Sequence, residues 1–444
     1  MKYSTFRFSA VKDHFRLVVV GGGAAGCAVT SKFARILPKQ QIAVIEHQNV
    51  HYYQPGLTLA AAGLMGFEQL HRDECSVLPH GVKWFQKPVH HLHPDSNELF
   101  LENGQAISYD FLVLATGLEL RFDLIEGLSS GTESVLLSPS ISSIYFPDGA
   151  KKTLEELRKF STGAAVFTFP STHIKCAGAP QKICFLAEEI LRRKGIRSNC
   201  SVHYYTALGR IFGVPKYAAS LERIVKERGV ELHPRHNLVK VNPEKHEAEF
   251  ELLDEKGKGT GQRQIVEYSF LHIGPPCSPV KVLREYAKES RNNSNGTQLT
   301  DPEGWVNVDP GTLQSPAFQN VFAIGDCANT PNSKTAAAVS SQFKALSKNL
   351  KNAMDNKKPT EKYDGYASCP LVVDRRHVIL AEFSPDGPLE TFPYDQSRPT
   401  IFAYLMKRYL MPSLYWMFLL NGYWEGPANL RKAFGLFSRR PSGK

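Results

Sequence analysis

Residues 17–26 read LVVVGGGAAG, an apolar run followed by a loop of glycines and alanines. Gly21, Gly23 and Gly26 match the pattern G-x-G-x-x-G. The apolar run predicts a buried parallel strand, and residues 24–36 predict a helix that stops before a proline. In such a connection the first glycine allows a tight turn, the second lets the backbone approach a pyrophosphate, and the third lets the helix pack on the strand. The stretch therefore predicts a dinucleotide-binding unit.

The residues around this loop define the expected ligand further. Glu46 ends a second buried strand about 20 positions after the loop, where a carboxylate accepts hydrogen bonds from a ribose diol and repels a 2′-phosphate. Ala24 and Ala25 begin the helix, whose free amides and positive dipole end favour phosphate. A tight turn without a ligand is the alternative, and the surrounding strand and helix argue against it.

Two later segments favour FAD over NAD. Residues 115–117, ATG, end another buried strand, and residues 321–326, VFAIGD, form a late strand and turn. This arrangement resembles the flavoproteins with two dinucleotide-binding domains, which implies that Gly325 and Asp326 hold the ribityl and pyrophosphate region. A helix that starts near Thr335 would direct its positive end at the flavin ring. The small residues that would let its backbone come close are Ala336, Ala337, Ala338 and Val339.

Strands and helices alternate a second time in the middle of the chain, and this second series interrupts the first. The sequence therefore predicts an α/β protein with two Rossmann-like dinucleotide-binding domains and a C-terminal amphipathic, membrane-associating region. The expected boundaries are 15–120 and 276–395 for the FAD-binding domain, 121–275 for the second domain, and 396–444 for the C-terminal region. Residues 1–14 are basic and form either a residual targeting segment or a ragged start.

The second unit lacks a second glycine fingerprint. After its strand at 164–169 the chain reads PSTHIKCAGAP over residues 170–180, with one glycine and two prolines. This loop does not suit a second dinucleotide, so NAD(P)H is not the expected electron donor. Cys176 stands there instead, beside Lys175 and just before a predicted helix, and both features lower a thiol pKa. A reactive thiolate is one interpretation of Cys176, and an inert buried cysteine is the other.

Several segments together resemble sulfide:quinone oxidoreductase of the eukaryotic mitochondrial type. They are KCAGAPQK at 175–182, IFGV at 211–214, KTAAA at 334–338, KYDGY at 362–366 with SCPL at 368–371, and LETFP at 389–393. The similarity runs from about Leu17 to Leu436. The resemblance implies an FAD enzyme of the mitochondrial inner membrane, peripheral or monotopic, that oxidises hydrogen sulfide and reduces ubiquinone.

The resemblance also implies residue roles. Cys176 and Cys369 are the redox pair: sulfide attacks the bridged cysteines, a persulfide remains on Cys369, and the Cys176 thiolate passes two electrons to the flavin. Glutathione or sulfite then removes the sulfur. No cysteine lies between Cys75 and Cys176, which favours a two-cysteine cycle over a three-cysteine one. The flavin contacts carried over are Ala24, Ala25, Glu46, Gln54, Val89, Asp326 and Ala336 to Val339.

The remaining cysteines and a histidine cluster are expected to be structural. The eight cysteines contain no CxxC pair, which argues against structural zinc, and no metal is expected. His90, His91 and His93 favour a solvated strand edge over a metal site. The cysteines expected to act as small buried hydrophobes are Cys27, Cys75, Cys184, Cys200, Cys277 and Cys327.

Residues 401–424 are aromatic and apolar, but Lys407, Arg408 and Pro412 interrupt them. The segment is expected to be broken at the proline and to lie in a membrane surface rather than cross it. The cations expected to contact anionic lipid are Arg431, Lys432, Arg439 and Arg440. A helix pair that covers the core, or a dimer interface, is the alternative.

The net charge of +10 does not by itself identify a partner. The positive charge is spread along the chain without a Lys/Arg run, so no nucleic-acid partner is expected. Two rival functions remain at this point: a type II NADH:quinone oxidoreductase, which the missing second fingerprint disfavours, and a non-catalytic flavin-bound scaffold.

Overall fold

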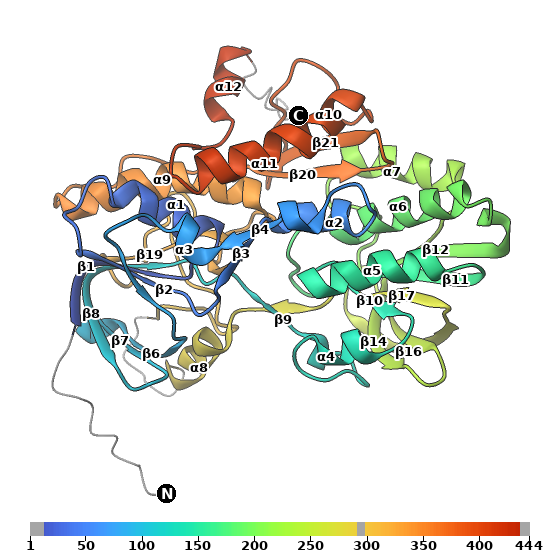
Figure 1. Ribbon diagram of the computed structural model, residues 1–444, viewed down its shortest axis with the longest axis horizontal. Coiled ribbons are helices and arrows are strands. Elements are labelled where there is room, and N and C mark those ends of the chain that lie inside the picture. Colours follow the sequence, from blue (N-terminus) through green and yellow to red (C-terminus); the bar gives the residue numbers. More distant parts are fainter. Residues whose placement is uncertain (1–12, 291–297, 436–444) are drawn as a thin grey trace, which may run out of the picture.

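The computed structural model describes residues 13–290 and 298–435 of the 444-residue chain. Figure 1 shows two α/β halves side by side, with the C-terminal helices along one edge of both. Most of the expected targeting segment lies outside the described residues. Asp13 and His14, which were expected to belong to that segment, instead begin the first strand, β1 (Asp13–Val20).

The first half is built on a sheet of seven strands in the order β5-β2-β1-β8-β7-β6, with β19 paired to β8. Five of these strands run parallel, and two antiparallel strands complete one edge. The predicted buried strands before the glycine loop, before Glu46 and before the late turn are all present. The bounds are β2 (Ile42–Ile45), β5 (Lys83–Phe85), β6 (Val89–His93), β7 (Glu98–Leu101), β8 (Ala106–Leu114) and β19 (Val321–Ala323).

The glycine loop joins β1 to helix α1 (Ala24–Phe33) as the sequence predicts, although the helix ends three residues early. Gly21 has φ +106, and a Cβ there would lie 2.4 Å from the carbonyl oxygen of Ala115. A Cβ on Gly26 would lie 1.8 Å from the carbonyl oxygen of Gly21. Only glycine fits either position, and α1 consequently packs directly on its strand and on α9 (Ala336–Met354).

The second half contains a parallel five-stranded sheet in the order β10-β17-β11-β12-β13. A three-stranded antiparallel sheet, β14-β15-β16, packs beside it. The strands are β10 (Ile141–Ser142), β11 (Gly163–Phe169), β12 (Cys200–Thr206), β13 (Glu231–Pro234), β14 (His236–Asn242), β15 (Glu247–Leu253), β16 (Gly259–Glu267) and β17 (Phe270–His272).

Three amphipathic helices accompany the second sheet: α5 (Pro147–Lys159), α6 (Ala179–Arg193) and α7 (Pro215–Glu227). Each has a proline in its first turn, where the missing amide costs nothing. Helix α5 begins at Pro147, whose fixed φ suits the first helical position. The shorter helices and strands are β3 (Val50–Tyr52), β4 (His71–Asp73), β9 (Glu119–Leu120), β18 (Cys277–Ser278), α2 (Leu57–Ala60), α3 (Glu74–Val77), α4 (Glu133–Leu137) and α8 (Lys281–Ser290).

A small antiparallel sheet formed by β20 (Ala367–Val372), β21 (Val378–Ser384) and β22 (Gly387–Pro388) follows α9. Helices α10 (Ile401–Leu405), α11 (Met411–Ser413) and α12 (Ala428–Ala433) come last and lie above the first half and the junction in Figure 1. Among the described residues no helix combines the length and apolar character that a bilayer crossing requires.

The expectation that Pro412 breaks the aromatic segment is wrong. The chain stays helical through it, because residues Met406–Leu410 and Leu414–Leu419 wind as π-helix on either side. The wider π-helical turns let the helix continue although proline has no backbone N–H to donate. Of the cations expected to contact lipid, Arg431 does not fit, because it is buried and pairs with Asp364 at 2.6 Å. Arg439 and Arg440 lie outside the described residues.

Candidate active site between the two halves

A cavity of about 830 Å³ lies where the two halves and the C-terminal helices meet. Most of the residues that the sequence assigns to the site line this one cavity. They are Gly23, Ala24, Ala25, Glu46, Gln54, Gly325, Asp326, Ala336, Ala337, Val339, Cys176 and Cys369. Gly21, Gly26 and Ala338 support its wall without lining it, and Val89 begins the edge strand β6, so its contact with FAD stays a prediction.

The loop end of the cavity suits the nucleotide part of FAD. Gly22 donates its amide to one carboxylate oxygen of Glu46 at 2.8 Å, and Gln48 donates to the other at 2.8 Å. The carboxylate is thereby held on the cavity wall. Gly23 is exposed, and a Cβ there would meet no atom within 4 Å, which leaves open space in front of the helix amides for a pyrophosphate.

The late turn presents a carboxylate to the middle of the cavity. Burial raises the pKa of Asp326, and the ammonium groups of Lys334 and Lys175 oppose that rise. Lys334 Nζ donates to the backbone oxygen of Asp326 at 2.7 Å and lies 4.0 Å from the Trp305 ring centre. Because these bonds leave the carboxylate itself available, Asp326 can accept a hydrogen bond from a ribityl hydroxyl.

Helix α9 directs its N-terminus at the same cavity. The hydroxyl oxygen of Thr335 caps the helix by accepting the amide of Ala338 at 3.1 Å. Ala336 and Ala337 line the cavity with single methyl groups, so a planar ring can approach the helix end. The positive end of the dipole favours negative charge there. The residues present therefore fit FAD, which supplies two-electron redox chemistry when bound.

The two predicted redox cysteines meet at the other side of this cavity. Cys176 lies in the loop between β11 and α6, Cys369 lies on β20, and their Sγ atoms are 3.5 Å apart. A Cβ on Gly178 would lie 2.6 Å from Cys369 Sγ and 2.4 Å from Leu371 Cδ2, so only glycine lets the strand approach the loop. Cys176 itself has φ +54, a left-handed conformation unusual for a residue with a Cβ.

Lys182 is a functional residue that the sequence reasoning missed. Its Nζ donates to Cys176 Sγ at 3.4 Å and to Cys369 Sγ at 3.7 Å, and its side chain is buried. Lys175 was expected to provide this cation, but its Nζ donates to Gln54 Oε1 at 2.6 Å and to the backbone oxygen of Tyr145. The spacing of six residues between Cys176 and Lys182, across the start of a helix, is the sequence signal that could have identified it.

The pair is electrostatically asymmetric. The hydrogen bond from Cys369, followed by the ammonium groups of Lys182 and Lys407, holds the pKa of Cys176 well below its ordinary value. The same hydrogen bond, together with burial, raises the pKa of Cys369 well above it. These shifts favour Cys176 over Cys369 as the thiolate of the pair, and thiolate is the form that reacts.

Lys407 is the second missed residue. It was recognised only as a charge that interrupts the aromatic segment, yet it is buried on the face turned to the cavity. Burial, followed by the repulsion of Lys182, lowers its pKa to about 7. The sequence signal that could have identified Lys407 is its position within an otherwise apolar segment. Two buried lysines thus lie near one pair of sulfur atoms.

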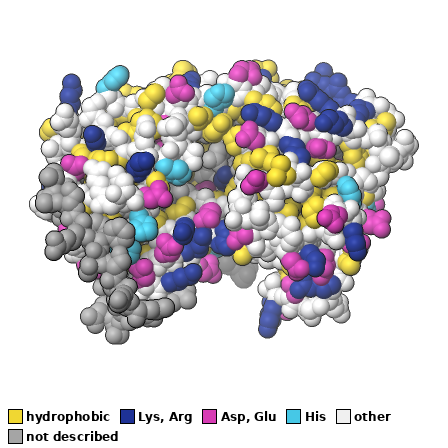
Figure 2. Space-filling view, turned by 60° about the horizontal axis from the view of Figure 1, so that its bottom comes forward, with side chains coloured by type: hydrophobic (Ala, Val, Ile, Leu, Met, Phe, Trp, Pro, Cys, Tyr) yellow, Lys and Arg dark blue, Asp and Glu magenta, His cyan; other side chains and the backbone are white. Residues whose placement is uncertain are grey.

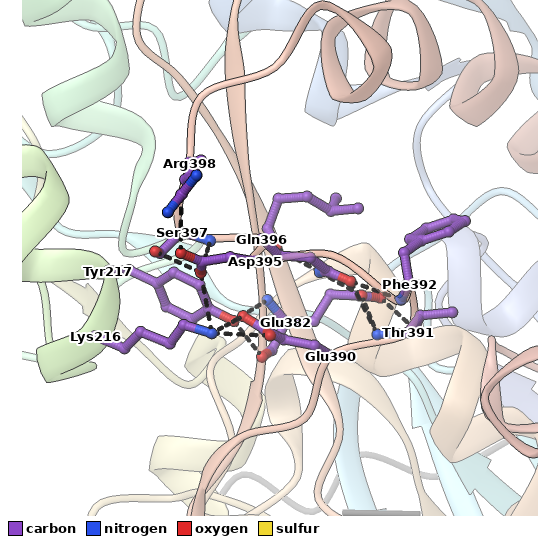
Figure 3. A network of polar contacts seen from close by, with 11 residues as sticks. Lys216, Tyr217, Glu382, Glu390, Thr391, Phe392, Asp395, Gln396, Ser397 and Arg398 are labelled. Atoms are coloured by element: carbon purple, nitrogen blue, oxygen red, sulfur yellow. Dashed lines mark hydrogen bonds and ion pairs between the residues drawn. The ribbon is translucent and has the colours of Figure 1, made fainter. Parts of the chain in front are cut away.

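A buried carboxylate supports the strands behind Cys369. Glu382 on β21 pairs in register with Ser368, and Figure 3 shows the residues that surround it. Thr391 Oγ1 donates to Glu382 Oε1 at 2.8 Å, and Gln396 Nε2 donates to Oε2 at 2.8 Å. Tyr366 donates a further bond of 2.5 Å. These bonds hold the segment after β22 against the sheet that carries the cysteine.

A second buried chain of contacts joins the C-terminal segment to the glycine loop. The Tyr415 hydroxyl and His51 Nε2 are 2.7 Å apart. His51 Nδ1 lies 3.1 Å from the carbonyl oxygen of Gly22 and 3.2 Å from Glu74 Oε2. Cys27 Sγ also donates to the Gly22 oxygen, at 2.9 Å. The segment 401–424 is therefore seated on the same peptide that borders the cofactor cavity.

Comparison with known proteins gives the family. The chain is 44% identical to mitochondrial sulfide:quinone oxidoreductase of Mus musculus over 426 residues, which is 96% of this chain and 90% of the relative. The chain belongs to the sulfide:quinone oxidoreductase family. The mitochondrial enzyme of Dictyostelium discoideum is 37% identical over 95% of this chain and 89% of its own length. The resemblance stated from the sequence is thus confirmed.

Residues 15–143 match the pyridine nucleotide-disulphide oxidoreductase family. The crystal structure of the sulfide:quinone oxidoreductase from Aquifex aeolicus aligns with a TM-score of 0.75 at 20% identity, covering 96% of this chain and 95% of that one. This similarity confirms the predicted Rossmann-like α/β fold. FAD is accordingly the cofactor of this sulfide:quinone oxidoreductase family member.

The other cysteines and the histidine cluster differ in whether they lie where the sequence predicts. Cys27, Cys184, Cys200, Cys277 and Cys327 are buried as expected. Cys75 is exposed, so the expectation of burial is wrong for it, because the short helix α3 leaves it at the surface. The histidine cluster lies on the edge strand β6, where His90 and His93 are exposed.

Proposed function

We propose that this enzyme oxidises hydrogen sulfide at the pair formed by Cys176 and Cys369 and transfers the electrons through FAD to ubiquinone. The observation that supports the proposal is the 3.5 Å approach of the two sulfur atoms, to both of which Lys182 Nζ donates, inside the cavity that also holds the predicted FAD contacts. We propose the domain boundaries that the sequence predicts, except that the FAD-binding domain begins with β1 at Asp13.

The proposed cycle starts from a disulfide between the two cysteines. Hydrosulfide attacks the sulfur of Cys369, the S–S bond breaks, and Cys176 leaves as the thiolate. The low pKa of Cys176 suits it to be the leaving group, and the ammonium of Lys182 lies where the negative charge develops. Cys369 now carries the sulfane sulfur as a persulfide.

Sulfur then leaves and the disulfide returns. A thiolate such as glutathione, or sulfite, takes the outer sulfur from Cys369 and releases its thiolate. The two thiolates re-form the disulfide and give up two electrons, which FAD, held by residues such as Glu46 and Asp326, would carry to ubiquinone. The sum is hydrogen sulfide plus glutathione plus ubiquinone giving glutathione persulfide plus ubiquinol, which balances in atoms and electrons.

The apolar end of the cavity is the proposed quinone entry. Phe392, Phe402, Met406, Leu410 and Phe434 line it, and the C-terminal helices carry exposed apolar side chains on their outer surface. The exposed members include Ile401, Phe402, Leu405, Tyr409, Leu410, Met417, Phe418 and Tyr423. Such a surface suits monotopic attachment to the mitochondrial inner membrane, with Lys432 near anionic headgroups.

On the face shown in Figure 2, Lys and Arg side chains are interspersed with Asp and Glu side chains. This face therefore offers no uniform basic surface to an anionic membrane, and we propose attachment through the apolar side chains of the C-terminal helices. Binding to vesicles with and without anionic lipid tests this point, and loss of binding after Phe402→Ser with Phe418→Ser is expected.

The deciding experiment is reduction of decylubiquinone by sulfide, with and without glutathione. Cys176→Ser and Cys369→Ser should each abolish this activity while the purified protein retains its flavin absorbance. Cys75→Ser, at an exposed cysteine outside the cavity, is the matched control and should keep full activity. Full activity in either cavity variant would refute the cysteine mechanism. Bleaching of the flavin by NADH would favour the rival NADH dehydrogenase.

A further inference from the structure

Three potential metal ligands come together in the second half, outside the cavity. The parallel register of β12 and β13 places His203 directly opposite Glu231. His233 follows two residues along β13 and therefore projects from the same face as Glu231. The backbone of a regular sheet, rather than a loop, thus holds all three side chains, and none of them lines the cofactor cavity.

The separations between the ligand atoms suit a single small cation. His203 Nδ1 is 3.2 Å from His233 Nε2 and 3.4 Å from Glu231 Oε2, and all three atoms lie within 4.8 Å of one another. Zinc bonds to nitrogen and oxygen are about 2.0–2.2 Å long, so neighbouring ligand atoms of a tetrahedral site are about 3.3–3.5 Å apart. Two of the three separations already have about that length.

The charge state of the cluster also fits a metal. Burial lowers the pKa of His203, and burial followed by repulsion from His203 and His236 lowers that of His233 to about 4. Neutral imidazole is the form that ligates a metal. Glu231 is 57% exposed, and His203 is its only ion-pair partner within the described residues. Its carboxylate thus faces the two rings, and no Lys or Arg of the described residues forms an ion pair with it.

Neighbouring residues fix the rings without competing for the cation. Tyr205 stacks on His233 with ring centres 4.1 Å apart and an angle of 8° between the planes. The two ring nitrogens of His236 are engaged elsewhere, with the backbone oxygen of Pro234 at 2.7 Å and with Gln264 Oε1 at 3.0 Å. His236 therefore lies close to the cluster without offering it a free ring nitrogen.

We propose that His203, Glu231 and His233 form a binding site for a divalent transition metal, for which Zn²⁺ is the best match. Two imidazoles and one carboxylate make up three positions of a tetrahedron, and the exposed side of Glu231 leaves the fourth to water. Each ring then carries its proton on the nitrogen that faces away from the metal. Because β13 is the edge strand of its sheet, the metal also ties that edge to β12.

Calorimetric titration of the tag-free, FAD-loaded enzyme with ZnCl₂ tests the proposal, with MgCl₂ as the negative control. We expect one equivalent of Zn²⁺ to bind in the wild type and to be lost in His233→Gln and His203→Gln. Glu231→Gln, at a 57% exposed position, removes the anionic ligand and should weaken zinc binding by more than the about 10- to 100-fold that loss of an outer-shell partner costs. His236→Gln should keep the equivalent.

Zinc-edge X-ray absorption identifies the ligands and excludes capture by the redox cysteines. Only nitrogen and oxygen neighbours near 2.0–2.2 Å are expected, whereas a zinc–sulfur distance near 2.3 Å would place the metal at a cysteine. His93→Gln controls for the edge-strand histidines, since the rings of His91 and His93 lie 4.5 Å apart. Absence of binding, sulfur ligands, or equal stoichiometry in wild type and His233→Gln would overturn the proposal.

Discussion

The two halves of the protein connect strand to helix in different ways. In the first half β1 ends at Val20 and α1 begins at Ala24, so the three glycines 21–23 form the whole connection. In the second half β11 ends at Phe169 and α6 begins at Ala179, which leaves residues 170–178 between them. The short connection exposes helix amides to a phosphate, whereas the long one brings Cys176 to the cavity.

This difference shows how one architecture serves two purposes. A close approach is required in both halves, but Gly21 and Gly26 let backbone segments pack against each other, whereas Gly178 makes room for the sulfur of Cys369. The positive charge differs as well. Helix dipole and amides provide it in the first half, and the ammonium of Lys182 provides it in the second.

The largest effect is expected from Gly26→Ala, which breaks the first connection. The new Cβ would overlap the carbonyl oxygen of Gly21, so the helix cannot stay packed on its strand. We expect the purified protein to contain no flavin, which the ratio of flavin to protein absorbance measures. Gly104→Ala, where φ is +83 but no atom lies within 4 Å of the added Cβ, controls for loss of a glycine. Full flavin content in Gly26→Ala would contradict the claim that the close packing of the first connection is needed to bind FAD.

Gly178→Ala breaks the second connection while leaving the first intact. Its Cβ would push Cys369 Sγ away from Cys176, and misplacement of a reacting group by about 1 Å can cost about 100-fold in rate. We therefore expect normal flavin content with sulfide-dependent quinone reduction lowered about 100-fold. Loss of flavin in this variant would mean that the two connections are not independent.

The same contrast explains what the sequence could predict. The glycine fingerprint and Glu46 were recognisable because they are close together in the sequence and each glycine is required by the backbone conformation. The pairing of Cys176 with Cys369 came only from family resemblance, since 193 positions separate them. Lys182 and Lys407 were missed because the direction of a long side chain depends on packing, which no local pattern encodes.

The helical path through Pro412 was mispredicted for a related reason. Proline does break ordinary α-helix, so the local rule pointed to an interruption. In the structure the flanking turns become π-helical, and Tyr415, Trp416 and Leu419 are buried against the first half. Tertiary packing of these side chains outweighs the local preference, and it was not visible from hydropathy alone.

A smaller effect is expected from Lys182→Met, which removes the charge on the second connection and keeps the side-chain volume. Lys182 is one of the groups that lower the pKa of Cys176, so its loss raises that pKa and reduces the thiolate fraction at a given pH. In the enzyme reduced without sulfide, the pH midpoint for iodoacetamide alkylation of Cys176 should move upward. We expect alkylation at neutral pH to be about 10-fold slower.

Lys175→Met is the matched control, because its ammonium contacts Gln54 and Tyr145 instead of either sulfur. It should leave the alkylation midpoint of Cys176 in place. An equal shift in both variants would show that general positive charge, rather than the contact from Lys182, sets the reactivity of the thiol.

The smallest effect concerns the contact between the C-terminal segment and the first connection. Tyr415→Phe removes the hydroxyl 2.7 Å from His51 Nε2, and His51 is one of the groups that hold the Gly22 carbonyl. Loss of one buried hydrogen bond costs about 1 kcal/mol. Since the segment and the glycine loop share this chain of contacts, we expect FAD to dissociate about fivefold more readily on dilution, measured by the recovery of flavin fluorescence. Tyr409→Phe, at an exposed tyrosine of the same segment, should behave as the wild type. If Tyr415→Phe also matches the wild type, the segment is seated on the first half by apolar packing alone, and the polar chain does not link it to the cofactor loop.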